Sequence, residues 1–369
     1  MPTPSLQSIR RSTNTVDDGP QPQQIDSLAP PGNHRHPTAR GRVETRVYDG
    51  LVTPAQLKAF AAIVRHGSAK AAAEELGVSE AAISSHTAAL RKELNDPLYR
   101  RSANGLAFTP GGLRLATRAA ELLGLQDQTR LEVEAASKGQ RILRLATTAL
   151  FAEYAAAGLI ELFKTRADDL HVEMSVHGSS GFDELLHSRQ TDVAIGPAAG
   201  GSRPGLNSRE FLRYQLILVV SGKHPLAGRR ADRAKMASQP WLLGPAAAES
   251  NGATAQLLKR FGVPEENQRI FQSHAAALAE TQEGNGIGVV PEFRVKEALA
   301  KKQLYRLSAN GAAASAVWEA TTLGLEQASP VAIELVRFVT TPRAIQAMLT
   351  GSGANISRFR PRVHVTLWS

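Results

Sequence analysis

The sequence predicts an α/β protein that begins with a winged helix-turn-helix, continues into one long helix and ends in a larger α/β part. Two short helical segments are joined by the tight turn "GVS", and two strand-like runs then flank "SANG". From residue 141, strand-like segments alternate with helical ones, which predicts a mostly parallel sheet with helices on both faces. With 369 residues, the chain is long enough for two or three domains.

The composition narrows the class of protein. No apolar run approaches the roughly 18 residues of a membrane span, and the first residues lack the apolar core of a secretion signal. The absence of cysteine excludes disulfides, thiolate metal sites and a cysteine nucleophile. We therefore expect a cytoplasmic protein that does not enter a membrane.

The net charge of +9 does not by itself indicate a nucleic-acid partner. Residues 141–369 hold 26 basic and 20 acidic side chains, whereas residues 51–140, which contain the helix-turn-helix, hold 11 and 9. A DNA-binding function must therefore rest on the pattern of residues.

Residues 1–50 are rich in Pro, Gln, Arg, Ser and Gly and predict a disordered tail, in which "HRH" is solvated. Three helices follow. "LVTPAQLKAFAAIVRHGS" has Pro54 at an allowed first-turn position. "SAKAAAEELG" is a helix that Ser68 can cap and Gly77 can end. The third helix starts after the cap Ser79 and has an apolar face that extends to Leu94.

The runs "LYRR" and "LAFT" predict a small hairpin, the wing, within residues 51–109. Residues 110–138 then predict a single long helix. Its apolar positions form only a narrow seam, which favours pairing with a second copy over packing within one chain. The seam consists of Leu113, Ala116, Ala120, Leu123 and Leu131.

Eight strands are expected in the second part, residues 141–349. They are "RILRLATTAL", "LHVEMSVHG", "TDVAIGP", "YQLILVVS", "PWLLGP", "RIFQS", "IGVVP" and "WEATTLGL". One helix from Pro330 to about Leu349 closes this part, and residues 350–369 form a basic C-terminal extension.

Residues 51–349 resemble the LysR-type transcriptional regulators. The motif "QLKAFAAIVRHGSAKAAAEELGVSEAAISSHTAALRKELNDPLYRR", followed by "GLAFTPGG", follows the family's order almost position by position. Three positions depart from the family pattern, namely Ala69, Glu80 and Ala81. The version "SSHTAALRKELNDPLYRR" looks like an actinobacterial branch, some of whose members lie beside carbon monoxide dehydrogenase or carbon-assimilation genes.

The resemblance implies a winged helix-turn-helix that binds double-stranded promoter DNA, a dimerising linker helix and an effector-binding domain. That last domain is similar to periplasmic binding proteins, with two α/β lobes around a small metabolite. A homodimer or homotetramer that also contacts RNA polymerase is implied.

The third helix is the expected reading helix. A major groove about 12 Å wide admits a helix whose leading residues are small or form hydrogen bonds, as Ser79, Ser84, Ser85, Thr87 and His86 do. The candidate DNA-binding residues are Ser68, Lys70, Ser79, Glu80, Ala81, Ser84, Ser85, His86, Arg91, Arg100, Arg101 and Thr109.

Alternatives stay open for four of these residues. Glu80 can accept a hydrogen bond from cytosine N4, or it simply lies at the helix N-terminus as a favourable partner of the helix dipole. Arg91 lies near the DNA backbone or on an ordinary solvated face. On the wing, the family's arginine corresponds to Arg101, which we therefore favour over Arg100.

The resemblance places the effector in the cleft between the lobes, at strand ends and helix N-termini. Thr147 and Thr148 end the first strand and precede a helix, which suits an anion or carboxylate. A lone histidine is more often a structural hydrogen-bonding group than a ligand contact. The candidates across the cleft are Gly196, Pro197, Ser273 and His274.

Other functions find little support in the motifs. "GNGIG" follows a helix and precedes a strand, the reverse of a dinucleotide fingerprint, and "GSSG" lacks the spacing of a nucleophile elbow. We predict a regulator that is not an enzyme and needs no metal or cofactor besides its effector. The alternative is a solute-binding protein without a transcriptional role, which has no use for residues 51–137.

Overall fold

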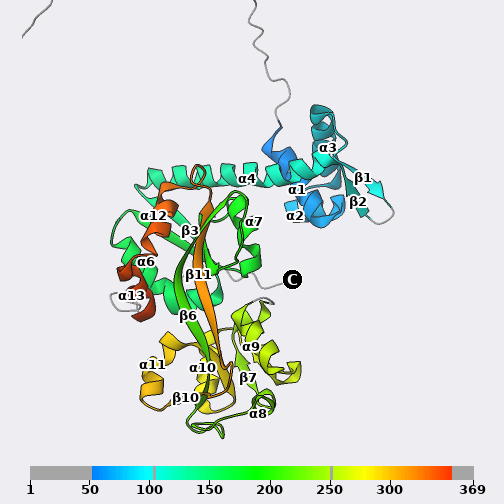
Figure 1. Ribbon diagram of the computed structural model, residues 1–369. Helices are drawn as coiled ribbons and strands as arrows, with labels where there is room; N and C mark the ends of the chain where they lie inside the picture. The colour runs from blue at the N-terminus through cyan, green and yellow to red at the C-terminus, as the bar shows by residue number, and fades with distance from the viewer. Residues whose placement is uncertain (1–51, 103–104, 250–251, 351–369) are drawn as a thin grey trace, which may run out of the picture. The chain divides into compact units, whose positions relative to one another are not determined.

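The computed structural model describes residues 52–102, 105–249 and 252–350 (Figure 1). The tail expected over residues 1–50 and the extension expected after residue 350 lie outside the described residues.

Three helices form the helix-turn-helix: α1 (Pro54–His66), α2 (Ala69–Leu76) and α3 (Glu80–Leu94). Each begins after a capping residue, because Thr53, Ser68 and Ser79 accept hydrogen bonds from backbone N–H groups of the first turn. Gly67 and Gly77 end α1 and α2 in the left-handed region, at φ 65° and 63°. The predicted caps at Ser68 and Ser79 and the predicted end at Gly77 are confirmed.

The core between these helices is built from small and β-branched side chains. Ala59, Ile63, Ala72 and Ile83 are buried together. The prediction that Leu94 continues this apolar face is wrong, because Leu94 is 41% exposed. The helix ends at Asn95, which has a left-handed φ of 49°, so the chain leaves the core one turn after Leu90.

The wing consists of β1 (Tyr99–Ser102) and β2 (Gly105–Phe108), which pair antiparallel with Tyr99 opposite Phe108. The hairpin predicted on either side of "SANG" is therefore confirmed. Its base packs against the helices, since Tyr99 and Phe108 lie beside a buried cluster of Phe60, Leu90 and Leu98. The hairpin and the three helices thus share one core.

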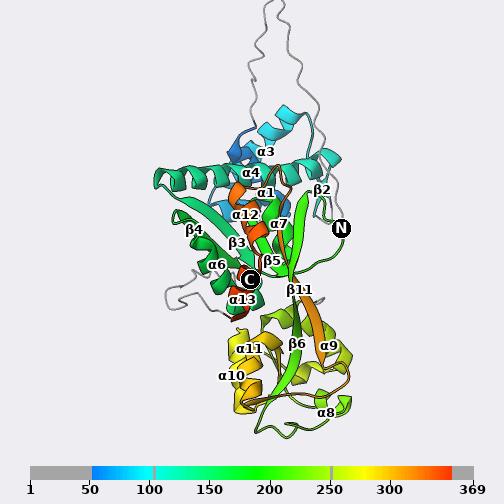
Figure 2. The ribbon, with the colours of Figure 1, turned by 60° about the vertical axis from the view of Figure 1, so that its left-hand side comes forward.

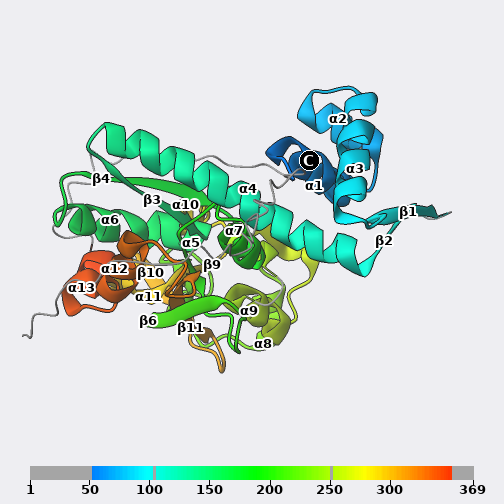
Figure 3. The same ribbon diagram turned by 90° about the horizontal axis from the view of Figure 1, so that it is seen from above.

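The long helix α4 (Pro110–Ser137) matches its predicted range to within one residue, and Figure 3 shows it as one continuous helix. The predicted seam is wrong in part. Ala116 packs on the core at the base of the wing, and Leu123 and Leu131 are half-buried within the chain. The exposed large apolar side chains of α4 are Leu113, which belongs to the predicted seam, and Leu122, Leu125 and Val133, which do not.

The second part is built on a nine-stranded sheet with the order β4-β3-β5-β11-β6-β9-β7-β8, in which β10 also pairs with β6. The strands are β3 (Arg141–Thr147), β4 (Leu170–Val176), β5 (Val193–Pro197), β6 (Leu206–Ser221), β7 (Trp241–Leu243), β8 (Gln268–Ile270), β9 (Ile287–Pro291), β10 (Leu304–Arg306) and β11 (Ala313–Leu323).

Helices of varied length connect these strands. They are α5 (Ala149–Phe151), the π-helix η1 (Ala152–Ala156), α6 (Ala157–Lys164), η2 (Ser179–Gly181), α7 (Phe182–His187), α8 (Arg233–Ala237), η3 (Pro245–Ala248), α9 (Ala253–Phe261), η4 (Glu265–Asn267), α10 (His274–Glu283), α11 (Glu292–Ala300), α12 (Pro330–Phe338) and α13 (Pro342–Thr350).

The prediction of a mostly parallel sheet is wrong. The pairs of β3 with β4 and β5, and of β7 with β8 and β9, are parallel, but every pair made by β6 or β11 is antiparallel. These two long strands run through both lobes (Figure 2), with β3, β4 and β5 in the first lobe and β7, β8 and β9 in the second. The chain therefore crosses between the lobes on two antiparallel strands, which strand-by-strand patterns do not reveal.

The single helix expected from Pro330 to Leu349 is also wrong. Two helices, α12 and α13, are separated by residues 339–341. Pro342 has no N–H and disfavours helical backbone in the residue before it, so the first helix cannot continue through it. Among the described residues no helix is long and apolar enough to cross a membrane.

Candidate DNA-binding surface and effector pocket

The solvent-facing side of α3 carries small side chains. Ala81, Ser84 and Ser85 are exposed, and Glu80 occupies the first turn directly after the capping residue Ser79. No long side chain stands among these three positions, so backbone and side chains of α3 can approach another surface closely. This is the geometry that a groove-reading helix requires.

Thr87 does not belong to this surface. The sequence grouped it with the hydroxyl side chains suited to a groove, but it is only 2% exposed. Its Oγ1 donates a hydrogen bond of 2.8 Å to the Ile83 carbonyl oxygen one turn earlier. Four residues after Ile83, Thr87 shares that residue's buried face, so the expectation for Thr87 is wrong. The neighbouring His86 is half-buried.

Arg91 is engaged within the domain. Its Nε donates to the Pro97 carbonyl oxygen at 2.7 Å and an Nη donates to that of Tyr99 at 3.2 Å. The guanidinium carbon also lies 4.3 Å from the centre of the Tyr99 ring. Arg91 therefore joins the end of α3 to the start of the wing, which neither of its two expected positions anticipated.

The other basic candidates form no such hydrogen bonds with the residues that the structure describes. Lys70 on α2 and both wing arginines, Arg100 and Arg101, are exposed. Ser68 is half-buried and its hydroxyl oxygen accepts from the Ala71 N–H as the cap of α2.

Thr109 holds the junction between the wing and α4. Its hydroxyl donates to Asp96 Oδ1 at 2.7 Å and accepts from the Gly112 N–H at 2.9 Å. The Thr109 hydrogen bond, together with that from the Leu98 N–H, lowers the pKa of Asp96. Leu98 has a left-handed φ of 61°, and a Cβ on Gly112 would lie 1.9 Å from its carbonyl oxygen. The segments "NDPLYRR" and "FTPGG" therefore pack against each other where the wing meets α4.

A pocket of about 40 Å³ lies in the second part of the chain. Two of the six predicted effector-binding residues, Thr148 and Pro197, line it. The described lining residues are Thr148, Leu150, Pro197, Tyr214, Leu216, Ala246, Glu249, Gly252, Ala253, Thr254 and Ala316.

The other four predicted residues are not in this lining. Thr147 is fully buried, and its Oγ1 donates to the Ile195 carbonyl oxygen at 2.9 Å, which fastens β3 to β5. A Cβ on Gly196 would lie 2.6 Å from the Phe182 ring. Ser273 caps α10, since its Oγ accepts from the Ala276 N–H.

His274 joins the two lobes. Its backbone N–H and its Nδ1 lie 2.9 and 3.1 Å from Glu153 Oε1, and the Ala275 N–H donates to Oε2 at 2.8 Å. Burial of Glu153 raises its pKa, but the hydrogen bonds and charge at the start of α10 outweigh that effect and the pKa is lowered. The imidazole is 5% exposed and has this structural partner on its Nδ1 side.

Glu249 is the charged residue that the sequence analysis missed. It lines the pocket, and its Oε2 accepts a hydrogen bond of 3.1 Å from the Ser179 hydroxyl. Burial raises the pKa of this carboxyl group. The available signal was an acidic residue shortly after the buried run "WLLGP", although the short helix η3 separates it from the end of β7.

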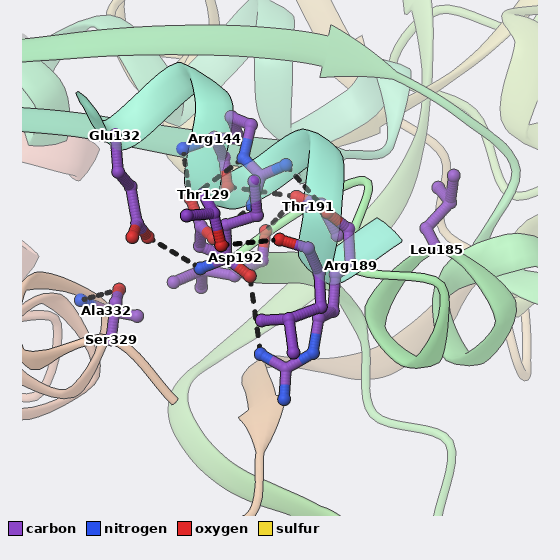
Figure 4. Close-up of polar contacts among 12 residues, drawn as sticks. Thr129, Glu132, Arg144, Leu185, Arg189, Thr191, Asp192, Ser329 and Ala332 are labelled. Carbon is purple, nitrogen blue, oxygen red and sulfur yellow. Dashed lines mark hydrogen bonds and ion pairs between the residues drawn. The ribbon is translucent and has the colours of Figure 1, made fainter. Parts of the chain in front are cut away.

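A second polar cluster ties α4 to the first lobe (Figure 4). Arg144 and Asp192 form an ion pair in which the side chains are 11% and 7% exposed. Arg144 also donates to the Arg189 carbonyl oxygen at 2.6 Å. The Arg189 side chain donates to Gln128 Oε1 on α4 at 3.3 Å. We call these four residues the linker cluster.

The chain combines a helix-turn-helix with a two-lobed substrate-binding domain, which defines a transcriptional regulator. Residues 54–113 match the model of the bacterial regulatory helix-turn-helix proteins of the lysR family, and residues 136–341 match the LysR substrate binding domain. The chain belongs to the LysR family. It therefore has a DNA-binding and an effector-binding domain, and the solute-binding alternative is set aside.

Individual proteins agree with this assignment. The chain is 52% identical over 321 residues to an uncharacterized HTH-type transcriptional regulator of Mycobacterium tuberculosis, covering 86% of this chain and 100% of that relative. The actinobacterial resemblance is thereby confirmed.

Two solved structures share the fold. The first is ArgP from Mycobacterium tuberculosis, with a TM-score of 0.53 and 20% sequence identity, covering 82% of this chain and 98% of that chain. The second is LysG from Corynebacterium glutamicum with bound effector Arg, with a TM-score of 0.52 and 18% sequence identity, covering 80% of this chain and 98% of that chain.

Proposed function

We propose that α3 and the wing bind promoter DNA, with α3 in the major groove. The exposed row of small side chains on α3 carries this proposal, since Ala81, Ser84 and Ser85 leave room for base edges. Lys70, Arg100 and Arg101 supply exposed charge for phosphates. Thr109, Arg91 and Ser68 act by holding the helices and the wing in place.

The experiment compares two arginine variants in retardation assays with the promoter region of the protein's own locus. Arg101→Gln should reduce the slope of log affinity against log salt by roughly 0.9 for each subunit bound, the value for one lost phosphate contact. Arg306→Gln on β10, which removes an exposed arginine that pairs with Glu292, is the matched control and should leave the slope unchanged. Equal slopes for the wild type and both variants would contradict the role given to the wing.

We propose that α4 pairs with a second copy to give a homodimer, from which a homotetramer can assemble. Leu122, Leu125 and Val133 are 53%, 43% and 65% exposed and lie on one face of the helix. Such a stripe on a long helix suits a helix-to-helix interface. Leu125→Glu should shift the molecular mass measured by light scattering towards the monomer, and an unchanged mass would remove this stripe from the interface.

We propose that residues 141–349 bind a small metabolite between the lobes and that binding changes how the subunits hold DNA and contact RNA polymerase. The pocket beside Thr148 and Pro197 supports this location. The regulator is proposed to work in the cytoplasm and to have no catalytic activity. Its domains are residues 51–109 for DNA binding, 110–138 for dimerisation and 141–349 for the effector.

A further inference from the structure

The described lining of the pocket carries negative charge and no positive charge. Among its described lining residues Glu249 is the single ionisable acid or base other than Tyr214, and no lysine, arginine or histidine is present. Hydroxyl groups of Thr148, Thr254 and Tyr214 add neutral hydrogen-bonding capacity, and the remaining lining is apolar or glycine. The charge offered to a ligand is therefore negative.

No described lysine or arginine pairs with Glu249, although the charge of His274 lowers its pKa against the larger effect of burial. Its hydrogen bond comes from Ser179, a neutral residue of the opposite lobe. The ion pairs of the described chain do not include it, and the nearby His274 is already paired with Glu153. A half-buried carboxylate without an adjacent lysine or arginine is costly to keep ionised, because the lost hydration is only partly replaced.

A ligand can supply the missing charge. An anionic group would be repelled by Glu249 and would add a second desolvated negative charge, whereas an ammonium or guanidinium group would form charge-assisted hydrogen bonds with it. The volume of about 40 Å³ has room for roughly three water molecules. The pocket thus fits the charged end of a metabolite rather than a whole one.

We propose that the effector is a cationic metabolite, an amine or a guanidine, whose charged nitrogen binds Glu249. This inference rests on the proposed function, because it takes the pocket to be the effector site. Ser179 holds the carboxylate towards the cleft from the other lobe, so binding of the cation and contact between the lobes involve the same side chain.

The test uses the full-length protein and two variants. Glu249→Gln keeps the size of the side chain and an acceptor for Ser179 but removes the charge. Glu173→Gln, an exposed glutamate on β4, is the matched control. Thermal stability is measured with millimolar L-arginine, L-lysine, agmatine and putrescine, and with 1,4-butanediol and succinate as neutral and anionic counterparts.

The expected result is that at least one amine or guanidine raises the melting temperature of the wild type and of Glu173→Gln, while 1,4-butanediol and succinate do not. Glu249→Gln should bind that compound more than about tenfold more weakly. Equal binding by Glu249→Gln, a response to succinate alone, or no response to any amine would overturn the proposal.

Promoter retardation separates this inference from the proposed function. Glu249→Gln without effector should bind the promoter region with the salt dependence of the wild type, because the DNA-binding surface is untouched. If DNA binds and only an acidic or neutral compound stabilises the protein, the cation is wrong and the regulator stands. If neither the wild type nor the variants bind promoter DNA, the proposed function is wrong, whether or not an amine stabilises the protein.

Discussion

The ion pair of Arg144 and Asp192 tests how strongly burial increases the contribution of an ion pair to the stability of this protein. Arg144→Met removes the guanidinium and keeps most of the side-chain volume. The change deletes hydrogen bonds of 2.6 and 3.2 Å to the two carboxylate oxygens and one of 2.6 Å to the Arg189 carbonyl oxygen. Asp192, 7% exposed, keeps the backbone N–H of residue 144 as a donor.

The expected loss follows from the uncompensated carboxylate. Removal of one partner of a buried ion pair costs about 3–5 kcal/mol, because the remaining charge stays out of water. For a domain the size of residues 141–349, this corresponds to a fall in melting temperature of roughly 6–20 °C. Asp192→Asn in the same chain removes the stranded charge and should recover part of that loss.

The same strand carries a matched control. Arg141 also binds an aspartate through two hydrogen bonds, at 2.7 and 2.8 Å to Asp169, but these side chains are 49% and 42% exposed. Water solvates both partners after Arg141→Met, so calorimetry and urea unfolding should detect little change. If the Arg144 and Arg141 variants lose equal stability, burial does not decide the value of these pairs and the reasoning fails.

Two further outcomes are expected. Gly112→Ala should lower the free energy of unfolding by about 1–3 kcal/mol, since its Cβ would lie 1.9 Å from the Leu98 carbonyl oxygen. The strained junction of the wing and α4 should also weaken promoter binding. Gly181→Ala, which meets nothing within 4 Å, should change neither, and equal effects would contradict this. The lowered pKa of Glu153 contributes stability that is present above its ordinary value of 4.5 and is lost as the pH falls through the folded value. The stability advantage of the wild type over Glu153→Gln, measured by urea unfolding followed by circular dichroism, should therefore shrink as the pH falls below the ordinary value of 4.5. An advantage that does not change with pH would exclude Glu153.

Local signals account for what the sequence predicted well. Ser68, Ser79 and Gly77 act within one turn of backbone, so their roles are readable without the rest of the chain. The range of α4 was readable for the same reason, because Thr109 and Pro110 begin a helix by local chemistry.

Tertiary contacts decided the remainder. The sequence does not distinguish Arg91 from other basic residues at helix ends, because its partner at Pro97 is brought close only when the chain turns into the wing. Thr87 has the same side-chain chemistry as Ser84 and differs only in which face the core covers. Glu249 and Thr148 are about 100 residues apart in the chain and share a pocket because β6 and β11 bring the two lobes together. The residue pattern of neither segment predicts that the two side chains lie close together.

The linker cluster also changes where the sensor begins as an independently folding unit. Gln128 on α4 is 8% exposed, and a Cβ on Gly124 would lie 1.7 Å from the Ser188 carbonyl oxygen, so this half of the helix belongs to the first lobe. A fragment starting at residue 141 would expose that contact and leave Arg189 without its amide partner. A fragment starting near residue 118 would keep both. Excising the sensor for crystallisation or ligand screening should therefore cut through the helix, two turns before Gly124, rather than in the turn that follows it.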